Sequence, residues 1–528
     1  MRESDREHFL KAMEKEIIDQ WDNGNFRLVP RSTVPKGKKI LPGVWALRRK
    51  RDAHTGQIKK YKARWNLDGS KQVHGVDFDQ TYSPTASWPS IRLLLTLASI
   101  HNWKTRQLDF VQAFPQAEIS HQQFVELPRG IEIEGVDPLL YVFEALRNVY
   151  GGKDAGRQWY LYLKSKLESI GFTVSRHDEC VFYRGSIMYV LYTDDSIIAA
   201  PTDKELDDVI VEMKETGLDL TVEGFLEDFL GVHIEINADG TIEMSQRRLI
   251  DSIIEEVFGN DQLPSPKDIP MASSKLLSRH LLSEDHDENR FSMRRIVGKL
   301  NFLSASTRPD LSYATHQIAR FVSKPKVEHT KAIEWLARYL IGTKDKGYIL
   351  RPDDTKSVEI YVDADYAGNW DQELAGVDID TARSRHGFLI KYAGVPLLWK
   401  SALQQECALS STESELIGLS MSLKTAIPLV SLLKEMNDFG FPVGDREKQI
   451  HCELFEDNNG ALAIATLPKV RPRTKHINNK YFHFVDNTRE GSGYSFHKID
   501  TDVQPADILT KPLPFDAFHR HRLHIQGW

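Results

Sequence analysis

Cysteine is scarce in this chain, which has three among 528 residues: Cys180, Cys407 and Cys452. Their spacing fits no metal site, and so sparse and odd a number excludes a disulfide framework and favours free thiols in a reducing compartment. Long apolar runs are lacking too, since none approaches the roughly 18 residues needed to span a bilayer. The charged start, MRESDREHFLKAMEKE, is unlike a signal peptide. We therefore expect an intracellular protein that is not secreted and has no membrane partner.

A large excess of one charge is also missing, because the net charge is −7 and charged residues make up 27% of the chain. The distribution is nevertheless uneven. Between Arg27 and Lys71 there are 14 basic residues and 2 acidic ones, a local charge of +12, and a second basic stretch runs from Lys469 to Lys480. Such segregation predicts a protein that grips a polyanion with some of its surfaces. A solvated charged face is the alternative for either stretch alone.

Two acidic positions interrupt apolar strand patterns in the first half of the chain. Asp109 ends the strand-like KTRQLDF, and Asp194 and Asp195 lie in a turn between the apolar runs MYVLY and SIIAA. If the two strands are neighbours, the carboxylates converge and repel each other unless cations lie between them. Paired Mg²⁺ ions about 3.5–4 Å apart are the usual device for phosphoryl transfer in polymerases and nucleases. An Asp-Asp pair in a hairpin turn is also ordinary turn chemistry.

The wider motifs resemble one family. The tetrapeptide YTDD (192–195) resembles the YxDD motif of reverse transcriptases, and QLDFVQAF (107–114) resembles QLDVKTAF of copia-type elements. Further matches follow in order along nearly the whole chain: VWALRRKRDAHTGQIKKYKAR, NVYGGKDAGRQWY, LEDFLGVHIEI, RRIVGKLNFLSASTRPDLSYA, SSTESELIGLS, FEDNNGALAIA and PADILTKPL. The chain is therefore similar to the reverse transcriptase with ribonuclease H domain of copia-type (Pseudoviridae-like) LTR retrotransposons.

The resemblance implies roles for residues of the polymerase part. Asp109, Asp194 and Asp195 match the family's metal ligands, and Phe114 matches its steric-gate aromatic, which selects deoxynucleotides. Lys62 and Arg64 become candidate triphosphate contacts, and Tyr150, Gly151 and Lys153 line the region of template and incoming nucleotide. Each has a simpler alternative: a core aromatic for Phe114, solvated cations for Lys62 and Arg64, and a turn before a helix for the region of Gly151.

Three departures from the family pattern favour a divergent lineage or a decaying copy. The usual ARLVAKG is here ARWNLDGS, LKQAP is GKDAG, and AFL has become AFP at Pro115. Asp154, within GKDAG, is expected to bring unwanted negative charge close to the nucleotide.

A second set of acids follows in the order Asp363, Glu415, Asp457, Asp507. They lie at strand ends, in the first turn of a helix and near the chain's end, and this order resembles the ribonuclease H fold, in which they would bind metal for hydrolysis. Asp365 competes with Asp363, and Glu413 with Glu415. Glu415 also fits a capping box with Thr412. His476 is a candidate for product release, or else an ordinary surface histidine.

The resemblance implies an α+β multidomain fold: a right-hand polymerase (fingers, palm and thumb) followed by a ribonuclease H-like mixed α/β domain. The expected segments are an N-terminal helix and link (1–40), fingers and palm (41–255), a helical thumb or connection (256–355), the ribonuclease H-like domain (356–515) and a C-terminal tail (516–528).

The expected function is RNA-directed DNA polymerisation by two-metal nucleotidyl transfer, with ribonuclease H activity on the RNA–DNA hybrid. The implied cofactors are Mg²⁺ or Mn²⁺, two ions per active site, and the implied partners are RNA template, DNA primer and product, the hybrid and deoxynucleoside triphosphates. The alternatives are a decayed relic that only binds nucleic acid and a nuclease with an inactive polymerase half. No protease or integrase pattern is present, so we expect a part of a longer polyprotein or a truncated insertion.

Overall fold

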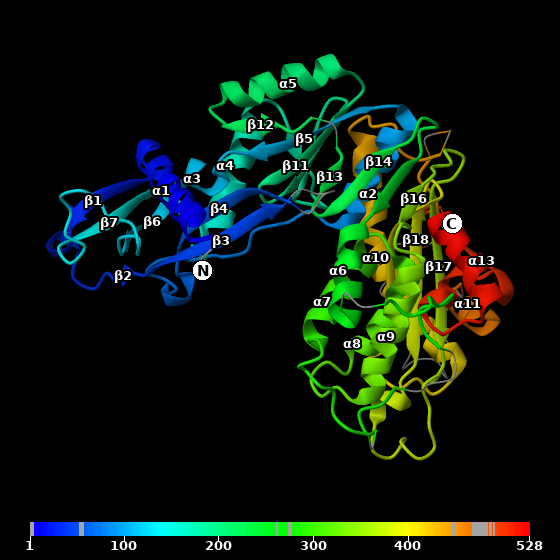
Figure 1. Ribbon diagram of the computed structural model, residues 1–528. Helices are drawn as coiled ribbons and strands as arrows, with labels where there is room; N and C mark the ends of the chain where they lie inside the picture. Colours follow the sequence, from blue (N-terminus) through cyan, green and yellow to red (C-terminus); the bar gives the residue numbers. More distant parts are fainter. Residues whose placement is uncertain are drawn as a thin grey trace.

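The computed structural model describes residues 5–51, 57–224, 226–259, 262–272, 277–281, 283–445, 447, 449–466, 484, 488 and 491–528. The N-terminal half extends to one side of a C-terminal unit in which helices pack against a sheet (Figure 1). The mixed α and β architecture confirms the predicted fold class.

The fingers begin with helix α1 (Arg6–Asp22), which buries Phe9, Met13 and Ile17 at helical spacing. The segment predicted as a link contains a strand, because β1 (Phe26–Pro30) pairs with β7 (Tyr141–Arg147), more than a hundred residues away. These strands join β6 (Glu118–Val125) and β2 (Ile40–Leu41) in the order β1-β7-β6-β2. A long hairpin of β3 (Gly43–Arg51) and β4 (Ile58–Leu67) lies beside them and carries the basic cluster.

The palm is a six-stranded sheet in the order β12-β5-β11-β10-β9-β8. Its strands are β5 (Lys104–Phe110), β8 (Thr173–Val174), β9 (Val181–Arg184), β10 (Ile187–Tyr192), β11 (Asp195–Ala200) and β12 (Leu220–Val222). Its helices are α2 (Trp88–His101), α3 (Ala113–Gln116), α4 (Ala155–Ser169) and α5 (Asp203–Glu215). The strand–turn–strand around YTDD was predicted from the apolar runs on either side of the turn and is confirmed.

A helical block follows the palm, with α6 (Arg247–Phe258), α7 (Met293–Ser306), α8 (Ser312–Ala319) and α9 (Val327–Gly342). Strands before and after these helices form a small sheet. Its strand order is β13 (Asp228–Phe229), β14 (Val232–Ile236), β15 (Ile242–Ser245) and β16 (Tyr348–Leu350). The expected boundary at residue 255 falls inside α6, because the buried face of that helix, Ile250, Ile253, Ile254 and Val257, runs across it.

The C-terminal unit has the sheet order β19-β18-β17-β20-β21, with β17 (Val358–Asp365), β18 (Arg385–Tyr392), β19 (Val395–Leu403), β20 (Cys452–Glu456) and β21 (Tyr494–Lys498). Helix α10 (Ser411–Asp438) covers one face, and α11 (Asn459–Ala465) follows β20. By length and composition α10 could cross a membrane, but 67% of its most apolar window is buried inside the protein. It serves here as a core helix.

The segment expected to be a tail forms a helix, α13 (Phe515–Gln526), preceded by the short 3-10 helix η8 (Pro505–Leu509). Phe518 and Ile525 are buried in the core that the helical block shares with the sheet. The indole of Trp528 donates a hydrogen bond to the Gly347 carbonyl at 2.7 Å. The sequence did not reveal this helix because its apolar residues are few and its partners lie far away in the chain.

Candidate active sites

The predicted polymerase carboxylates lie at one edge of the palm sheet. Asp109, near the end of β5, is the register partner of Asp195, at the start of β11. Asp194 lies in the turn between β10 and β11, after Thr193, whose φ of 57° is left-handed. The Trp159 indole donates a hydrogen bond to the Thr193 carbonyl at 2.7 Å and so holds this unfavourable turn in place. Strand register thus brings Asp109 opposite Asp195 at one edge of the sheet, with Asp194 in the adjoining turn. Within the described residues, these three acids do not form a group whose oxygens all lie within 4.8 Å of one another, so their joint binding of metal stays a prediction.

Cationic residues of the fingers face these acids. Arg64 on β4 has a guanidinium nitrogen 4.0 Å from Asp194 Oδ2, and its guanidinium carbon lies 4.6 Å from the centre of the Tyr150 ring. Lys62, Arg64, Asp109 and Tyr150 all line one cavity of about 340 Å³ between hairpin and palm. A triphosphate entering this cavity would meet both cations and the acidic sheet edge.

Phe114, on α3, lies beside this cavity, with its ring centre 5.3 Å from that of Tyr150. It is half-buried and packs against the palm core, so the structure is compatible with both the steric-gate role and the plain core role.

Replacement of Phe114 by Ala separates these two roles. If the ring limits the space beside the sugar, Phe114→Ala lowers the selection of deoxynucleotides over ribonucleotides by about 10- to 100-fold, measured as the ratio of kcat/KM values in primer extension. The matched control is Tyr162→Ala, which truncates another half-buried aromatic on the same core. A variant that melts earlier but keeps its sugar selection would assign Phe114 to the core alone.

Gly151 and Lys153 both make local structural contacts. Gly151 has a φ of 89°, and a Cβ there would lie 2.1 Å from the Leu67 carbonyl oxygen, so only glycine allows the end of β4 to approach. The Lys153 ammonium lies over the Phe78 ring at 4.9 Å, and its backbone N–H donates to the Gln72 side chain. The simpler interpretation, a turn before a helix, fits both residues.

The expected intrusion of Asp154 into the nucleotide site is wrong. Asp154 is buried, with 3% of its surface exposed, directly before α4, where it accepts a hydrogen bond from the Ser120 hydroxyl. A carboxylate is favoured near the N-terminus of a helix, so the departure GKDAG has a local structural explanation.

Glu16 is a residue of the polymerase cavity that the sequence did not reveal. It lies on α1 and lines the cavity with Lys62 and Arg64, and burial raises the pKa of its carboxyl group. Its spacing from Met13 and Gln20 places an acid on the buried face of an amphipathic helix, which is the signal that could have identified it.

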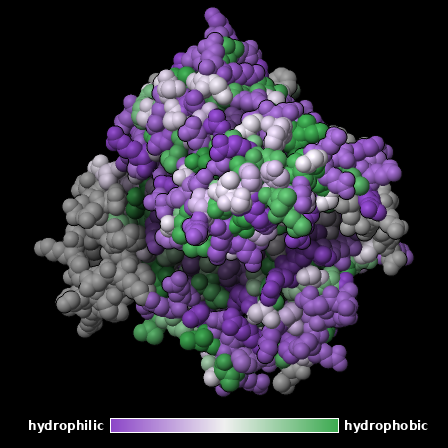
Figure 2. Space-filling view, turned by 90° about the vertical axis from the view of Figure 1, so that its left-hand side faces the viewer, coloured by the Kyte–Doolittle hydropathy of each residue, from purple (hydrophilic) through white to green (hydrophobic). Residues whose placement is uncertain are grey.

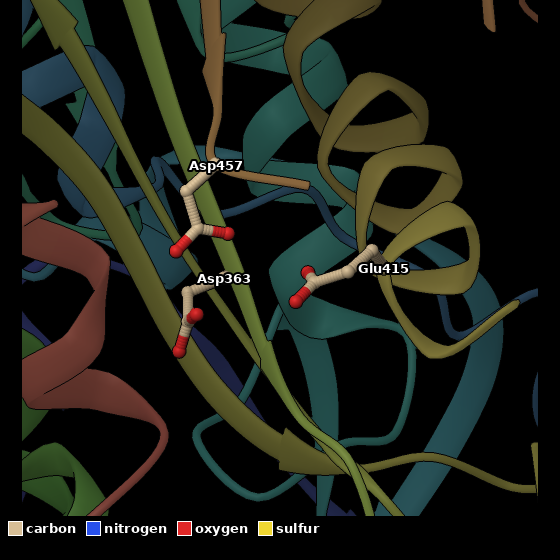
Figure 3. Close-up of side chains that lie close together, drawn as sticks. All are labelled: Asp363, Glu415 and Asp457. Atoms are coloured by element: carbon tan, nitrogen blue, oxygen red, sulfur yellow. The ribbon is translucent and has the colours of Figure 1, made fainter. Parts of the chain in front are cut away.

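The second acidic set gathers at the end of the C-terminal sheet. Carboxylate oxygens of Asp363, Glu415 and Asp457 lie within 4.8 Å of one another (Figure 3). Asp363 belongs to β17, Asp457 follows β20, and these two strands are parallel and in register. The Glu415 side chain extends from the first turns of α10 toward the two aspartates (Figure 3). Three acids that are far apart in the sequence thus form a single cluster in the structure.

Asp507, the fourth predicted acid, adjoins this cluster through Lys511. The Lys511 ammonium lies 2.9 Å from Asp507 Oδ1 and 3.8 Å from Asp363 Oδ2. The Thr510 hydroxyl donates a further hydrogen bond to Asp363. One ammonium thus partly compensates two of the carboxylates.

The structure distinguishes Glu415 from Glu413 and Asp363 from Asp365, the alternatives that the sequence left open. Glu413 is half-buried and accepts a hydrogen bond from the Leu409 N–H, while Ser410 caps α10 through the Glu413 N–H. The cap is therefore Ser410, and Thr412 does not form it with Glu415. Asp365 lies outside the three-residue group, so Asp363 has the better position. His476 and the basic stretch from Lys469 to Lys480 lie outside the described residues.

Buried carboxyl groups crowd together at this site, which disfavours their charged forms. Burial and then the charge of Glu456 raise the pKa of Glu415 to about 11. Glu456, which the sequence did not single out, is fully buried at the end of β20 and accepts a hydrogen bond from the Asn458 N–H at 3.0 Å. Within the described residues, Oε2 of Glu415 and Oε2 of Glu456 have no hydrogen-bond partner. Unsatisfied carboxylate oxygens in a buried group suit a hard divalent cation.

We expect the free energy of unfolding of the metal-free protein to depend on pH because of these buried carboxyl groups. Burial, then the charge of Asp363, raises the pKa of Asp507 to about 7, so the folded state keeps protons that the unfolded chain releases above about pH 4. The free energy of unfolding, measured by urea titration in chelator, should therefore fall as the pH rises from about 4 to 7. Mg²⁺ or Mn²⁺ should reduce this dependence, and equal pH profiles with and without metal would contradict a cation site here.

The fold is that of a right-hand polymerase followed by a ribonuclease H-like unit, and each of the two parts carries one acidic site. Residues 23–272 match the family described as "Reverse transcriptase (RNA-dependent DNA polymerase)". This match covers just under half of the chain, and the chain as a whole is similar to Pol polyproteins of copia-type retrotransposons.

Two curated relatives align with 97% of this chain. One is the retrovirus-related Pol polyprotein from transposon TNT 1-94 of Nicotiana tabacum, 30% identical over 525 residues that make up 37% of its length. The other is the corresponding polyprotein from transposon RE1 of Arabidopsis thaliana, 32% identical over 515 residues, or 33% of its length. The chain thus spans about a third of the length of these relatives.

Among solved structures, a foamy viral protease-reverse transcriptase in complex with double-stranded DNA superimposes with a TM-score of 0.51. It is 14% identical, and the match covers 93% of this chain and 69% of that one. This likeness supports the fold.

Proposed function

We propose that this chain is an RNA-directed DNA polymerase that works by two-metal nucleotidyl transfer. The observation that carries the proposal is the pairing of Asp109 with Asp195 at the edge of the palm sheet, with Asp194 in the adjoining turn, opposite Arg64. Three carboxylates at one edge fit the oxygen ligands that Mg²⁺ or Mn²⁺ prefers. When bound, such ions activate the primer 3′-hydroxyl and neutralise charge on the leaving pyrophosphate.

The residues around this edge divide the remaining tasks. Arg64 and Lys62 bind the triphosphate, and the ring of Tyr150 holds the Arg64 guanidinium in place. Phe114, which contacts Tyr150, limits the space beside the sugar. Hydrophilic side chains dominate the face of the molecule on the fingers side, which is hollowed across its middle (Figure 2). Such a surface suits a nucleic-acid duplex bound through its backbone.

We further propose that the second acidic site hydrolyses the RNA strand of an RNA–DNA hybrid, which the polymerase activity would leave behind. Asp363, Glu415 and Asp457 would hold the metal, and Asp507 would complete the set beside Lys511. Shape and backbone contacts would select the hybrid, because it is close to A-form.

The experiment that tests both proposals measures two activities on the same purified protein. Extension of a DNA primer on an RNA template and release of labelled RNA from a hybrid are followed with Mg²⁺, with Mn²⁺ and with chelator. Both activities should need a divalent ion. A decayed relic that only binds nucleic acid would shift the hybrid in a gel and turn over neither substrate. The burial of Asp154 removes one of the sequence arguments for that alternative.

A further inference from the structure

The palm and the C-terminal unit contact each other directly. In Figure 1, helix α2 of the palm lies where the palm meets α10 and the C-terminal sheet. A single hydrophobic core runs from the palm strands through the sheet of the C-terminal unit to α10, and it includes Leu94, Tyr189, Leu397 and Leu433. The two candidate active sites therefore stand on one continuous packed body.

Arg92 is the central polar residue of this junction. It lies on α2, only 2% of its surface is exposed, and no acidic side chain is paired with it among the described residues. Its guanidinium donates to the Leu397 carbonyl on β19 at 2.7 Å, and to the Ala305 and Ser306 carbonyls on α7 at 2.6 Å each. It also lies over the Trp399 ring at 4.0 Å.

This arrangement joins three units through one side chain. The Trp399 indole donates in turn to the Ser304 carbonyl at 2.8 Å, so β19 and α7 are also linked to each other. A buried guanidinium that moved away from these carbonyls would lose its partners without reaching water, which makes partial separation unfavourable.

A second set of contacts holds the far end of α10. The Glu435 carboxylate accepts hydrogen bonds from the Ser175 hydroxyl and the Arg176 N–H of the palm. The Tyr183 ring packs against Phe439 and Phe441, with ring centres 5.3 and 5.2 Å away. The C-terminal end of α10 is thus fixed to the palm, while Glu415 of the nuclease site lies near its N-terminal end.

Because α10 is one continuous helix, it sets the distance between its contact with the palm and Glu415 of the nuclease site. Glu415 and Glu435 are twenty residues apart on one helix, about 30 Å at 1.5 Å per residue. Pro428 lies within α10 without ending it. The helix is therefore a spacer of fixed length between a palm contact and a nuclease ligand.

We infer that Arg92 and Glu435 are positioning residues that fix the distance between the polymerase and nuclease sites, so that RNA is cut at set positions behind the primer terminus. This inference rests on the proposed function, since it needs both activities. A flexibly linked nuclease would instead scatter its cuts along the hybrid.

The test maps RNA cuts on a hybrid with a recessed primer terminus, in the absence of nucleotides. Wild-type protein should cut within a narrow window. Arg92→Lys and Glu435→Ala should lower the fraction of cuts at the main position by about twofold or more, with extension and total RNA cleavage little changed. Asp438→Asn, an exposed change on the same helix end, is the matched control. Unchanged cut positions in both variants, or equally scattered cuts in wild type, would overturn the inference.

A distance measurement separates this inference from the proposed function, because it needs no activity. Spin labels are attached at the exposed Cys407 and at Asp207→Cys on the exposed side of α5, while Cys180 and Cys452 are buried. A narrow distance distribution in wild type that broadens in Glu435→Ala supports the fixed spacing even if no RNA is cut, in which case only the ribonuclease proposal fails. A broad wild-type distribution rejects the spacing whatever the activities are.

Discussion

Asp194→Asn is expected to lower primer extension on an RNA template by about 100- to 1,000-fold, the scale on which preorganised electrostatic groups act at reacting centres. Asp194 lies in the turn beside the Asp109–Asp195 pair and 4.0 Å from Arg64, so its charge serves both the metal and the triphosphate contact. An amide at this position keeps the shape of the turn and removes the charge. The rate is measured by single-turnover extension at saturating Mg²⁺.

The matched control for this variant is Asp208→Asn on α5, which removes an exposed carboxylate from the same palm and should leave extension unchanged. Hydrolysis of hybrid RNA should persist in Asp194→Asn, because the second acidic set belongs to another sheet. Full extension by a correctly folded Asp194→Asn protein would remove this residue from the polymerase site.

Asp457→Asn is expected to give the complementary result: loss of RNA cleavage by a similar factor, with primer extension retained. Its oxygens lie within 4.8 Å of those of Asp363 and Glu415, so the substitution removes one ligand of the proposed metal. The Thr501 hydroxyl, which donates to Asp457 Oδ2 at 2.7 Å, can donate equally to the oxygen of an amide.

A thermal readout makes this prediction stricter. Because the cluster concentrates like charges, Asp457→Asn should raise the melting temperature in chelator while reducing the increase that Mg²⁺ or Mn²⁺ produces in wild type. Asp502→Asn, an exposed change in the neighbouring 3-10 helix η7 (Thr501–Val503), should alter neither quantity. Loss of both catalytic activities in Asp457→Asn would show that the two sites do not act separately.

Local patterns predicted the elements that hold the sites. The runs MYVLY and SIIAA on either side of a polar turn gave β10 and β11, because alternation and apolarity are readable over a few residues. Strand β1 and helix α13 were missed, since each is stabilised by partners more than a hundred residues away. The role of Asp154 was misjudged because its partner, Ser120, lies on another element.

The sequence by itself determined which acids are present, in what order, and that they lie at the ends of strands and in the first turns of a helix. Only the tertiary structure decided which of them meet. Strand register placed Asp109 opposite Asp195 and brought Asp363 near Asp457. Folding also buried Glu456 beside the second pair. It also decided that Arg92, one arginine among many in the sequence, joins three units. The reason is physical, because covalent order fixes the identity and spacing of side chains, whereas proximity and desolvation arise only when distant segments pack together.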